Sequence, residues 1–191
     1  MTTTQTVANE LKTHVNFARF AKHVKALGNQ CNDRQWRFAK GLILELSFEM
    51  CSNGNLKYVS QLGTDYIMPN YKNTSIEFKF EQKPLFGKRG NMSKHINPTL
   101  MNSRGTNKYV ELPSTYADYL IYATPNGALL FDKATVSNHL KISGDSITGN
   151  LPTNEGVILA DPTTMISDTQ EEVDIINPIM NMIRTWAQNI T

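Results

Sequence analysis

The stretch Gly63-Thr64-Asp65-Tyr66-Ile67-Met68-Pro69, the polar turn 70–74 and the run Ser75-Ile76-Glu77-Phe78-Lys79-Phe80-Glu81-Gln82 decide the fold of this chain. The second run alternates strictly: Ile76, Phe78 and Phe80 fall on one side, and Glu77, Lys79 and Glu81 fall on the other. This alternation has the period of a β-strand with a wholly apolar inner face. The sequence therefore predicts a hairpin in which the strand at 75–82 follows a strand that carries Asp65.

Three charged side chains meet in such a hairpin. Glu77 and Lys79 are two residues apart, so they project from one face of their strand, and Asp65 on the preceding strand meets them there. Two carboxylates and an ammonium suit metal-assisted hydrolysis of a phosphodiester. The carboxylates hold Mg²⁺, which prefers oxygen ligands, and the lysine orients or polarises the attacking water. The alternative is an amphipathic strand whose Glu/Lys face is solvated.

The pattern Asp65…Glu77-Phe78-Lys79 resembles the active-site motif of the PD-(D/E)XK nuclease superfamily, which includes most type II restriction endonucleases. Thr64 departs from the pattern, since it stands where the family name has proline, at a position that carries no chemistry. The resemblance covers about 33–140 and implies an α/β fold with a restriction-endonuclease-like core, in which helices flank a central mixed β-sheet. It also implies that Asp65, Glu77 and the main-chain carbonyl of Phe78 bind Mg²⁺, and that Lys79 acts on the water.

A helix is predicted before the hairpin, from Arg34 to about Cys51, with Asn32 or Asp33 as its N-cap and Ser52-Asn53-Gly54 as its end. The side chains spaced for its buried stripe are Trp36, Leu42, Ile43, Leu46 and Met50.

The same helix carries Glu45 and Glu49 four residues apart on one face. Glu45 stands among leucines and isoleucine, and a carboxylate in apolar surroundings needs a partner or a metal. The resemblance implies that this helix supplies another acidic residue, an outer-sphere or second-metal ligand, and Glu45 ranks ahead of Glu49 for this role. The alternative is a glutamate on the surface of the helix.

A basic segment follows the motif strand, because 83–108 holds no acidic residue. Its cationic and polar side chains expected to contact DNA are Lys83, Lys88, Arg89, Asn91, Lys94, His95, Asn97, Asn102, Arg104 and Lys108. Such residues neutralise phosphates and read base edges. The alternative is a mobile, solvated loop. Within the segment, Asn97-Pro98 followed by Thr99-Leu100-Met101-Asn102 predicts a helix start with proline at its first position.

The run Lys94-His95-Ile96-Asn97-Pro98 resembles a His-x-Asn-Pro element found at a like distance after the catalytic lysine in some small, blunt-cutting type II restriction enzymes. In those enzymes the histidine segment approaches the DNA. The resemblance therefore ranks a restriction enzyme first among the candidate functions.

The remaining elements form the scaffold. An amphipathic helix is expected from Thr4 to Leu27, either covering the core or building a dimer interface. Later segments predict strands at 118–124 and 128–131, a short helix at 132–140, a loop or hairpin at 141–152, an edge strand at 156–160 and a helix at 168–190. One nuclease domain over 1–191 is expected, with an N-terminal helix at 1–30, a catalytic core at 33–140 and a C-terminal part at 141–191.

Composition bounds the class of protein. The chain has 191 residues, of which 40% are hydrophobic, and a net charge of +2. This length is enough to bury one hydrophobic core. Cys31 and Cys51 bracket one predicted helix, roughly 30 Å apart, so they are expected as free thiols. No signal peptide and no apolar run for a membrane are expected, which favours the cytoplasm.

The expected function is a Mg²⁺-dependent, sequence-specific endonuclease for double-stranded DNA, a type II restriction enzyme. A palindromic target implies a homodimer with one active site for each strand. Two alternatives stay open: a structure-specific or recombination and repair nuclease of the same fold, and a non-catalytic nucleic-acid-binding protein.

Overall fold

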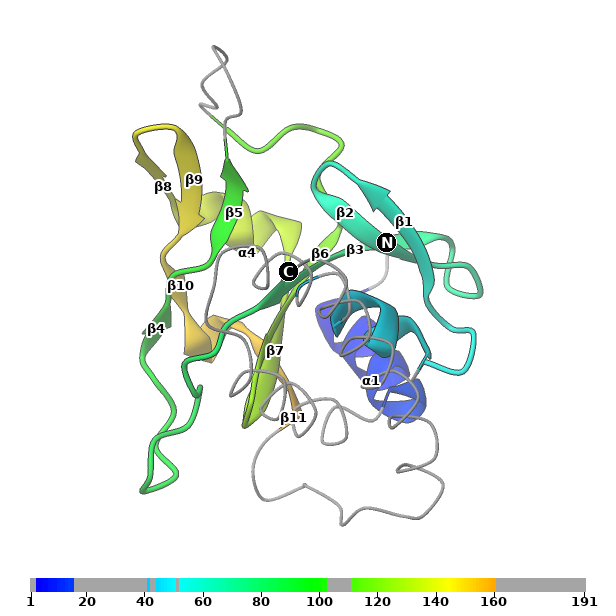
Figure 1. Cartoon of the computed structure of the whole chain (residues 1–191), viewed down its shortest axis with the longest axis horizontal. Helices are drawn as coiled ribbons and strands as arrows, with labels where there is room; N and C mark the ends of the chain where they lie inside the picture. Colours follow the sequence, from blue (N-terminus) through cyan, green and yellow to red (C-terminus); the bar gives the residue numbers. More distant parts are fainter. Residues whose placement is uncertain (1–2, 16–40, 42–43, 51, 103–110, 161–191) are drawn as a thin grey trace, which may run out of the picture.

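A six-stranded mixed β-sheet lies at the centre of the computed structural model, which describes residues 3–15, 41, 44–50, 52–102 and 111–160 (Figure 1). Its strands in spatial order are β1 (Lys57–Gln61), β2 (Thr64–Met68), β3 (Thr74–Phe80), β6 (Tyr119–Thr124), β7 (Gly127–Asp132) and β11 (Val157–Ala160). β3 and β6 pair in parallel, and the other neighbours in this sheet are antiparallel. The coarse prediction, an α/β chain with a central mixed sheet, is confirmed.

The hairpin of β2 and β3 forms as predicted. Tyr66 pairs with Ile76 and Met68 pairs with Thr74. The intervening turn is closed by backbone bonds from Tyr71 to Met68 and from Thr74 to Tyr71, each 3.0 Å long. Two apolar side chains of β3, Ile76 and Phe78, are buried on one face of the sheet. The residues between them therefore face the other side.

Apolar side chains cover both faces of the central sheet. On the face of Ile76 and Phe78 lie α1 (Thr4–His14), which packs against β7 and β11, and the helical segment 44–50. On the opposite face, a second cluster includes Tyr116, Leu120 and Leu129. Glu77 belongs to this second face, because its partner in the parallel β3–β6 pair is Leu120.

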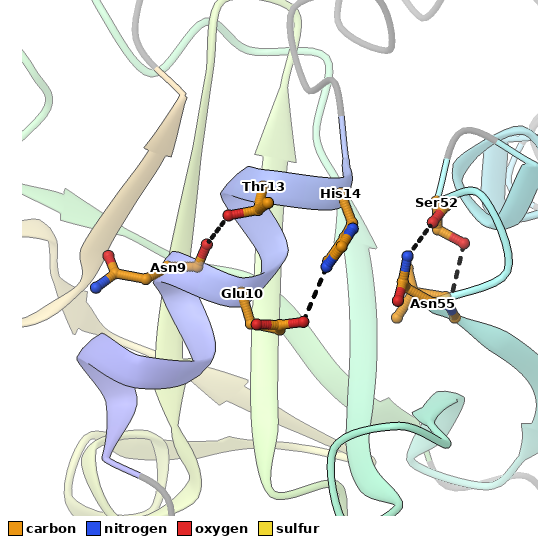
Figure 2. Close-up of polar contacts among 7 residues, drawn as sticks. Asn9, Glu10, Thr13, His14, Ser52 and Asn55 are labelled. Atoms are coloured by element: carbon orange, nitrogen blue, oxygen red, sulfur yellow. Dashed lines mark hydrogen bonds and ion pairs between the residues drawn. The ribbon is translucent and has the colours of Figure 1, made fainter.

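The first helix is shorter than predicted. α1 ends at His14, and Val15 is extended rather than helical, so a continuous helix from Thr4 to Leu27 is wrong. Figure 2 shows the last turn, where Thr13 donates to the carbonyl of Asn9 and His14 pairs with Glu10. Val15 is 4% exposed in its extended conformation. The apolar pattern thus continues past the helix end, because a residue that has left the helix still joins the core.

The helical segment 44–50 turns a different side to the core than predicted. Leu44 and Phe48 are buried, whereas Leu46 is 42% exposed and Met50 is 55% exposed. Phe48 sets the orientation because its ring packs on Tyr66 and Phe78, with centroids 5.4 and 4.8 Å away.

The helix ends as predicted in a turn at 52–55, in which Asn55 Nδ2 donates to the carbonyl of Ser52 at 2.9 Å (Figure 2). Asn53 and Gly54 in this turn have positive φ, a conformation that cannot continue a helix.

Two small sheets lie beside the central one. They are formed by β4 (His95–Ile96) with β10 (Leu151–Pro152), and by β5 (Thr99–Asn102), β9 (Ser146–Gly149) and β8 (Leu140–Ser143). The short helix α4 (Lys133–Asn138) and the 3₁₀ turn η1 (Thr153–Glu155) complete the described elements. The strands predicted at 118–124, 128–131 and 156–160, the hairpin within 141–152 and the short helix after Asp132 are confirmed.

The helix start predicted at Asn97-Pro98 is wrong, because the strand β5 follows at Thr99–Asn102. Met101 pairs with Ile147 of β9, and Gly149 donates its amide to the carbonyl of Pro98 at 2.9 Å. Proline opens a strand as readily as a helix, and the partner that decides between them is distant in sequence.

Several predictions lie outside the described residues. They are both cysteines, the helix at 168–190 and, apart from residue 41, the part of the predicted helix 34–51 that precedes residue 44. In the part of the chain that the structure describes, no helix is long and apolar enough to cross a membrane.

Candidate active site

Asp65 occupies the point where the backbone ladder between β2 and β3 stops. The last paired residues are Tyr66 and Ile76, so Asp65 and Glu77 each stand one residue beyond. Asp65 Oδ2 accepts a hydrogen bond from the amide of Phe78 at 2.7 Å. This bond supplies the amide with a partner and fixes the carboxylate between the strands. The hairpin therefore places the two acidic residues of the motif next to each other.

Glu77 is a buried carboxylate, with 3% of the residue exposed. Its Oε1 accepts a hydrogen bond from Lys79 Nζ, and Lys79 itself is 30% exposed. Its Oε2 is buried and has no hydrogen-bond partner among the described residues. A solvated Glu/Lys face, the alternative to a site, does not describe Glu77. An unpartnered buried oxygen costs about 1–3 kcal/mol, and either a proton shared with Asp65 or a bound cation would reduce this cost.

Glu45 and Glu49 have different surroundings. Glu45 Oε2 accepts from Tyr58 Oη at 3.2 Å, and the Glu45 carbonyl accepts from Tyr66 Oη. Burial raises the pKa of Glu45 to about 7, and the charge of Asp65 adds to this rise. Glu49 Oε1 instead accepts the amide of Tyr58 at 3.2 Å. The charges of Asp65 and Lys79 therefore act on Glu45, and its role as a ligand stays a prediction.

The cluster contains more negative than positive charge once its carboxyls ionise. Burial raises the pKa of Glu77 to about 7; Lys79 opposes this rise, and the charges of Asp65 and Glu45 add to it. Burial also raises the pKa of Asp65, against the lowering effects of the Phe78 amide, of Lys79 and of a hydrogen bond that Asp65 and Glu77 share when one of their carboxyls is protonated. Three ionised carboxylates beside one ammonium leave two negative charges, which is the charge that one divalent cation balances.

The donor set fits a hard divalent cation. Among the described residues no three His, Cys, Asp or Glu side chains already converge as a metal cluster. Mg²⁺ needs fewer, because it is usually held by one or two carboxylates and keeps several waters. Asp65 and Glu77 supply two adjacent carboxylates, one of them with the unpartnered Oε2. The described contact at Phe78 is its amide, so the metal role of the Phe78 carbonyl stays a prediction.

The raised pKa values predict how stability depends on pH. Some carboxyls have a higher pKa in the folded state than in the unfolded state. Such a group contributes its full stabilisation at pH values below the unfolded-state pKa, and this stabilisation is lost as the pH rises through the folded-state pKa. For Glu77 the window is from 4.5 to about 7, which corresponds to on the order of 3 kcal/mol. In thermal unfolding experiments in EDTA, the Tm of wild type should fall relative to the Tm of Glu77→Gln as the pH rises from 4.5 to about 7. A difference between the two proteins that stays constant from pH 5 to pH 8 contradicts the assignment.

The predicted DNA contacts of the basic segment after β3 are exposed where the structure describes them. Lys88 and Arg89 form the tip of a turn in which Gly87 and Asn91 are hydrogen-bonded at 2.9 Å. The other predicted DNA contacts that the structure describes are also exposed: Lys83, Asn91, Lys94, His95, Asn97 and Asn102. Arg104 and Lys108 lie outside the described residues.

A cavity of about 270 Å³ lies between this segment and the strands that neighbour the site. Its lining includes Lys83, His95 and Asn97 from the basic segment, together with Glu81 and Tyr122. Tyr122 is the β6 partner of Lys79, and Glu81 follows Lys79 by two residues, so both adjoin the face that carries the site. The structure therefore brings three of the ten predicted DNA contacts next to the Glu77–Lys79 face.

Sequence reasoning missed the tyrosines around the carboxylates. Tyr58 and Tyr66 bind Glu45, and Tyr116 lies close enough to Glu77 and Asp65 for their charges to raise its pKa further, after burial. Tyr66 belongs to the predicted strand that carries Asp65, whereas Tyr58 belongs to β1, a strand that was not predicted. Tyr116 stands in an irregular stretch, where no periodic pattern singles it out.

Comparisons with known proteins add no family. No model of a known protein family matches this sequence, and a search of the curated proteins gives no match.

Proposed function

We propose that this protein is a Mg²⁺-dependent endonuclease that hydrolyses phosphodiester bonds of double-stranded DNA, with a restriction-endonuclease-like core of the PD-(D/E)XK type. The observation that carries the proposal is the juxtaposition of Asp65, Glu77 and Lys79 on one largely buried face beside a cavity lined by cationic and amide side chains. The His-x-Asn-Pro resemblance makes a type II restriction enzyme the particular proposal.

Each side chain has a distinct role in this proposal. Asp65 and Glu77 would hold Mg²⁺, with the Phe78 carbonyl, and Glu45 would be an outer-sphere ligand or a ligand of a second metal ion. A bound Mg²⁺ supplies charge stabilisation for the phosphorane-like transition state and for the leaving oxygen. Lys79 orients the attacking water and stabilises the charge that develops on it. The Phe78 amide keeps Asp65 oriented, so that its carboxylate does not have to reorganise during the reaction.

The basic segment supplies the contacts to DNA. Exposed Lys88 and Arg89 at a turn tip reach phosphates, whereas His95 and Asn97 line the cavity closer to the site. Phosphate contacts position a protein on DNA, and contacts to base edges specify the sequence. We therefore propose that Lys88 and Arg89 position the protein on the DNA backbone. His95 and Asn97 at the cavity would contact base edges and so recognise the sequence. A palindromic target would require a homodimer, and a DNA substrate in a microbial cell would place the enzyme in the cytoplasm.

Neutralising the turn tip should weaken binding to every DNA sequence. Lys88→Gln with Arg89→Gln removes two phosphate contacts, so the slope of log affinity against log salt should fall by about two. The matched control is Lys12→Gln with Lys72→Gln, which removes two exposed lysines from α1 and from the β2–β3 turn. Binding to a labelled duplex at several salt concentrations in EDTA measures this. An unchanged slope in the first double variant shows that the tip does not touch DNA.

The substrate class can be tested with three DNA forms. Plasmid DNA incubated with the protein and Mg²⁺ should give discrete bands if the enzyme recognises a duplex sequence. Preferential cutting of branched or single-stranded DNA would replace the restriction role by a structure-specific one on the same site. No cleavage of any of the three, with binding retained, would leave a non-catalytic nucleic-acid-binding protein.

A further inference from the structure

Tyr116 presents a second buried polar atom without a partner. Its side chain is 2% exposed, and its hydroxyl makes no hydrogen bond among the described residues. In the described part of the chain, the same holds for one other buried side-chain atom, Glu77 Oε2. The two residues are neighbours in the fold, because Tyr116 packs in the same buried cluster as Leu120, and Leu120 is the β6 partner of Glu77.

The Tyr116 ring is held firmly in place. It packs on Gly63 so closely that a Cβ at that glycine would stand 2.8 Å from Tyr116 Cδ2. The amide of the next residue, Ala117, donates to the Gly63 carbonyl at 2.9 Å. On the other side, Lys133 Nζ donates to the Tyr116 carbonyl at 2.9 Å. The backbone around Tyr116 is thus anchored to the turn between β1 and β2 and to α4.

Burial of the Tyr116 hydroxyl without a hydrogen bond lowers the stability of the fold, and no described residue offsets this loss. A buried hydroxyl without a hydrogen bond destabilises a protein by about 1–3 kcal/mol, and phenylalanine would fill the same space without that loss. The nearby charges of Glu77 and Asp65 make the surroundings of this hydroxyl polar. A ligand between the hydroxyl and Glu77 Oε2 would give both atoms a partner.

We propose that Tyr116 is a positioning residue of the ion site: its hydroxyl donates a hydrogen bond to a hydration water of the divalent cation held by Glu77. The inference rests on the proposed function, because it assumes the cation. Groups that orient the ligands of a metal typically contribute tenfold to a hundredfold to its affinity. Tyr116 would thus fix the position of the cation relative to Lys79 without touching the substrate.

Calorimetric titration of Mn²⁺ at pH 8, without DNA, tests this role. The titration compares wild type with Tyr116→Phe, with the site variant Glu77→Gln and with the control Tyr71→Phe. The control removes a tyrosine hydroxyl at the β2–β3 turn. Tyr116→Phe should weaken Mn²⁺ binding about tenfold, and Tyr71→Phe should leave it unchanged. Thermal unfolding in EDTA should show that Tyr116→Phe is as stable as wild type or more stable, because it removes an unpartnered hydroxyl.

The opposite signs of the two effects separate the explanations. Unchanged Mn²⁺ affinity in Tyr116→Phe, with binding lost in Glu77→Gln, overturns the role of Tyr116 and leaves the ion site standing. Loss of both affinity and cation-free stability in Tyr116→Phe assigns the tyrosine to the fold and also overturns the proposal. No Mn²⁺ binding by wild type, or full binding by Glu77→Gln, overturns the ion site itself and Tyr116 with it.

Discussion

Glu77→Gln should abolish Mg²⁺-dependent cleavage while leaving the cation-free protein at least as stable as wild type at pH 8. Loss of a metal ligand removes several kcal/mol of charge stabilisation from the transition state. The expected fall in rate is therefore about a thousandfold or more. Asp65→Asn should behave in the same way, and Asp65→Ala and Glu77→Ala should likewise lose cleavage while binding DNA.

The stability half of this prediction follows from burial. At pH 8 the buried Glu77 is ionised against its raised pKa of about 7, which is unfavourable in the folded protein. Glutamine keeps an oxygen that can accept from Lys79 but carries no charge. Cleavage rates in Mg²⁺ and unfolding in EDTA are compared with Glu10→Gln, a change on α1 that should keep both at wild-type values. Full cleavage by Glu77→Gln contradicts the site, and a large loss of stability would make Glu77 structural.

Lys79→Met should lower the cleavage rate by about a hundredfold to ten-thousandfold, the usual contribution of acid–base or electrostatic help to a reacting water. Its effect on the cation should be the reverse. Lys79 Nζ donates to Glu77 Oε1, so the ammonium competes with the cation for that oxygen. Mg²⁺ affinity at pH 8 should therefore be unchanged or tighter in the variant.

The structure adds a pH condition to this second prediction. Lys79 lowers the pKa of Glu77, so removing it moves the protonation of Glu77 to higher pH. Below about pH 7 the variant should then bind the cation more weakly than wild type. Lys72→Met, at the exposed β2–β3 turn, is the control for loss of a lysine. Wild-type cleavage by Lys79→Met would end the mechanism, whereas weaker Mg²⁺ binding at pH 8 would make Lys79 a structural partner of Glu77.

Local patterns predicted the hairpin and the identity of its charged residues. Strict alternation over 75–81 fixed which side chains share a face, and the polar turn fixed that Asp65 returns beside Glu77. The burial of Glu77 is not local information. It comes from its place beside Leu120 and from the second apolar cluster, to which Tyr116 and Leu129 contribute from distant parts of the chain.

The wrong predictions have the same origin. Asn97-Pro98 carries the signal of a helix start, but the partner that makes 99–102 a strand is the hairpin strand β9, more than forty residues later. The apolar period over 42–50 did not define the buried side of the helix, because the rings of Tyr66 and Phe78 decide it. Tyr116 carries no local signal, since its position follows from contacts with Gly63 and Lys133.

The most direct test of the central claim is the rate of plasmid cleavage by wild type and Asp65→Asn, in Mg²⁺ and in EDTA. The claim is that Asp65, Glu77 and Lys79 form a metal-dependent site for phosphodiester hydrolysis. It predicts cleavage by wild type in Mg²⁺, none in EDTA, and none by a folded Asp65→Asn that still binds DNA. Cleavage by wild type in EDTA, or equal cleavage by the two proteins in Mg²⁺, would contradict it.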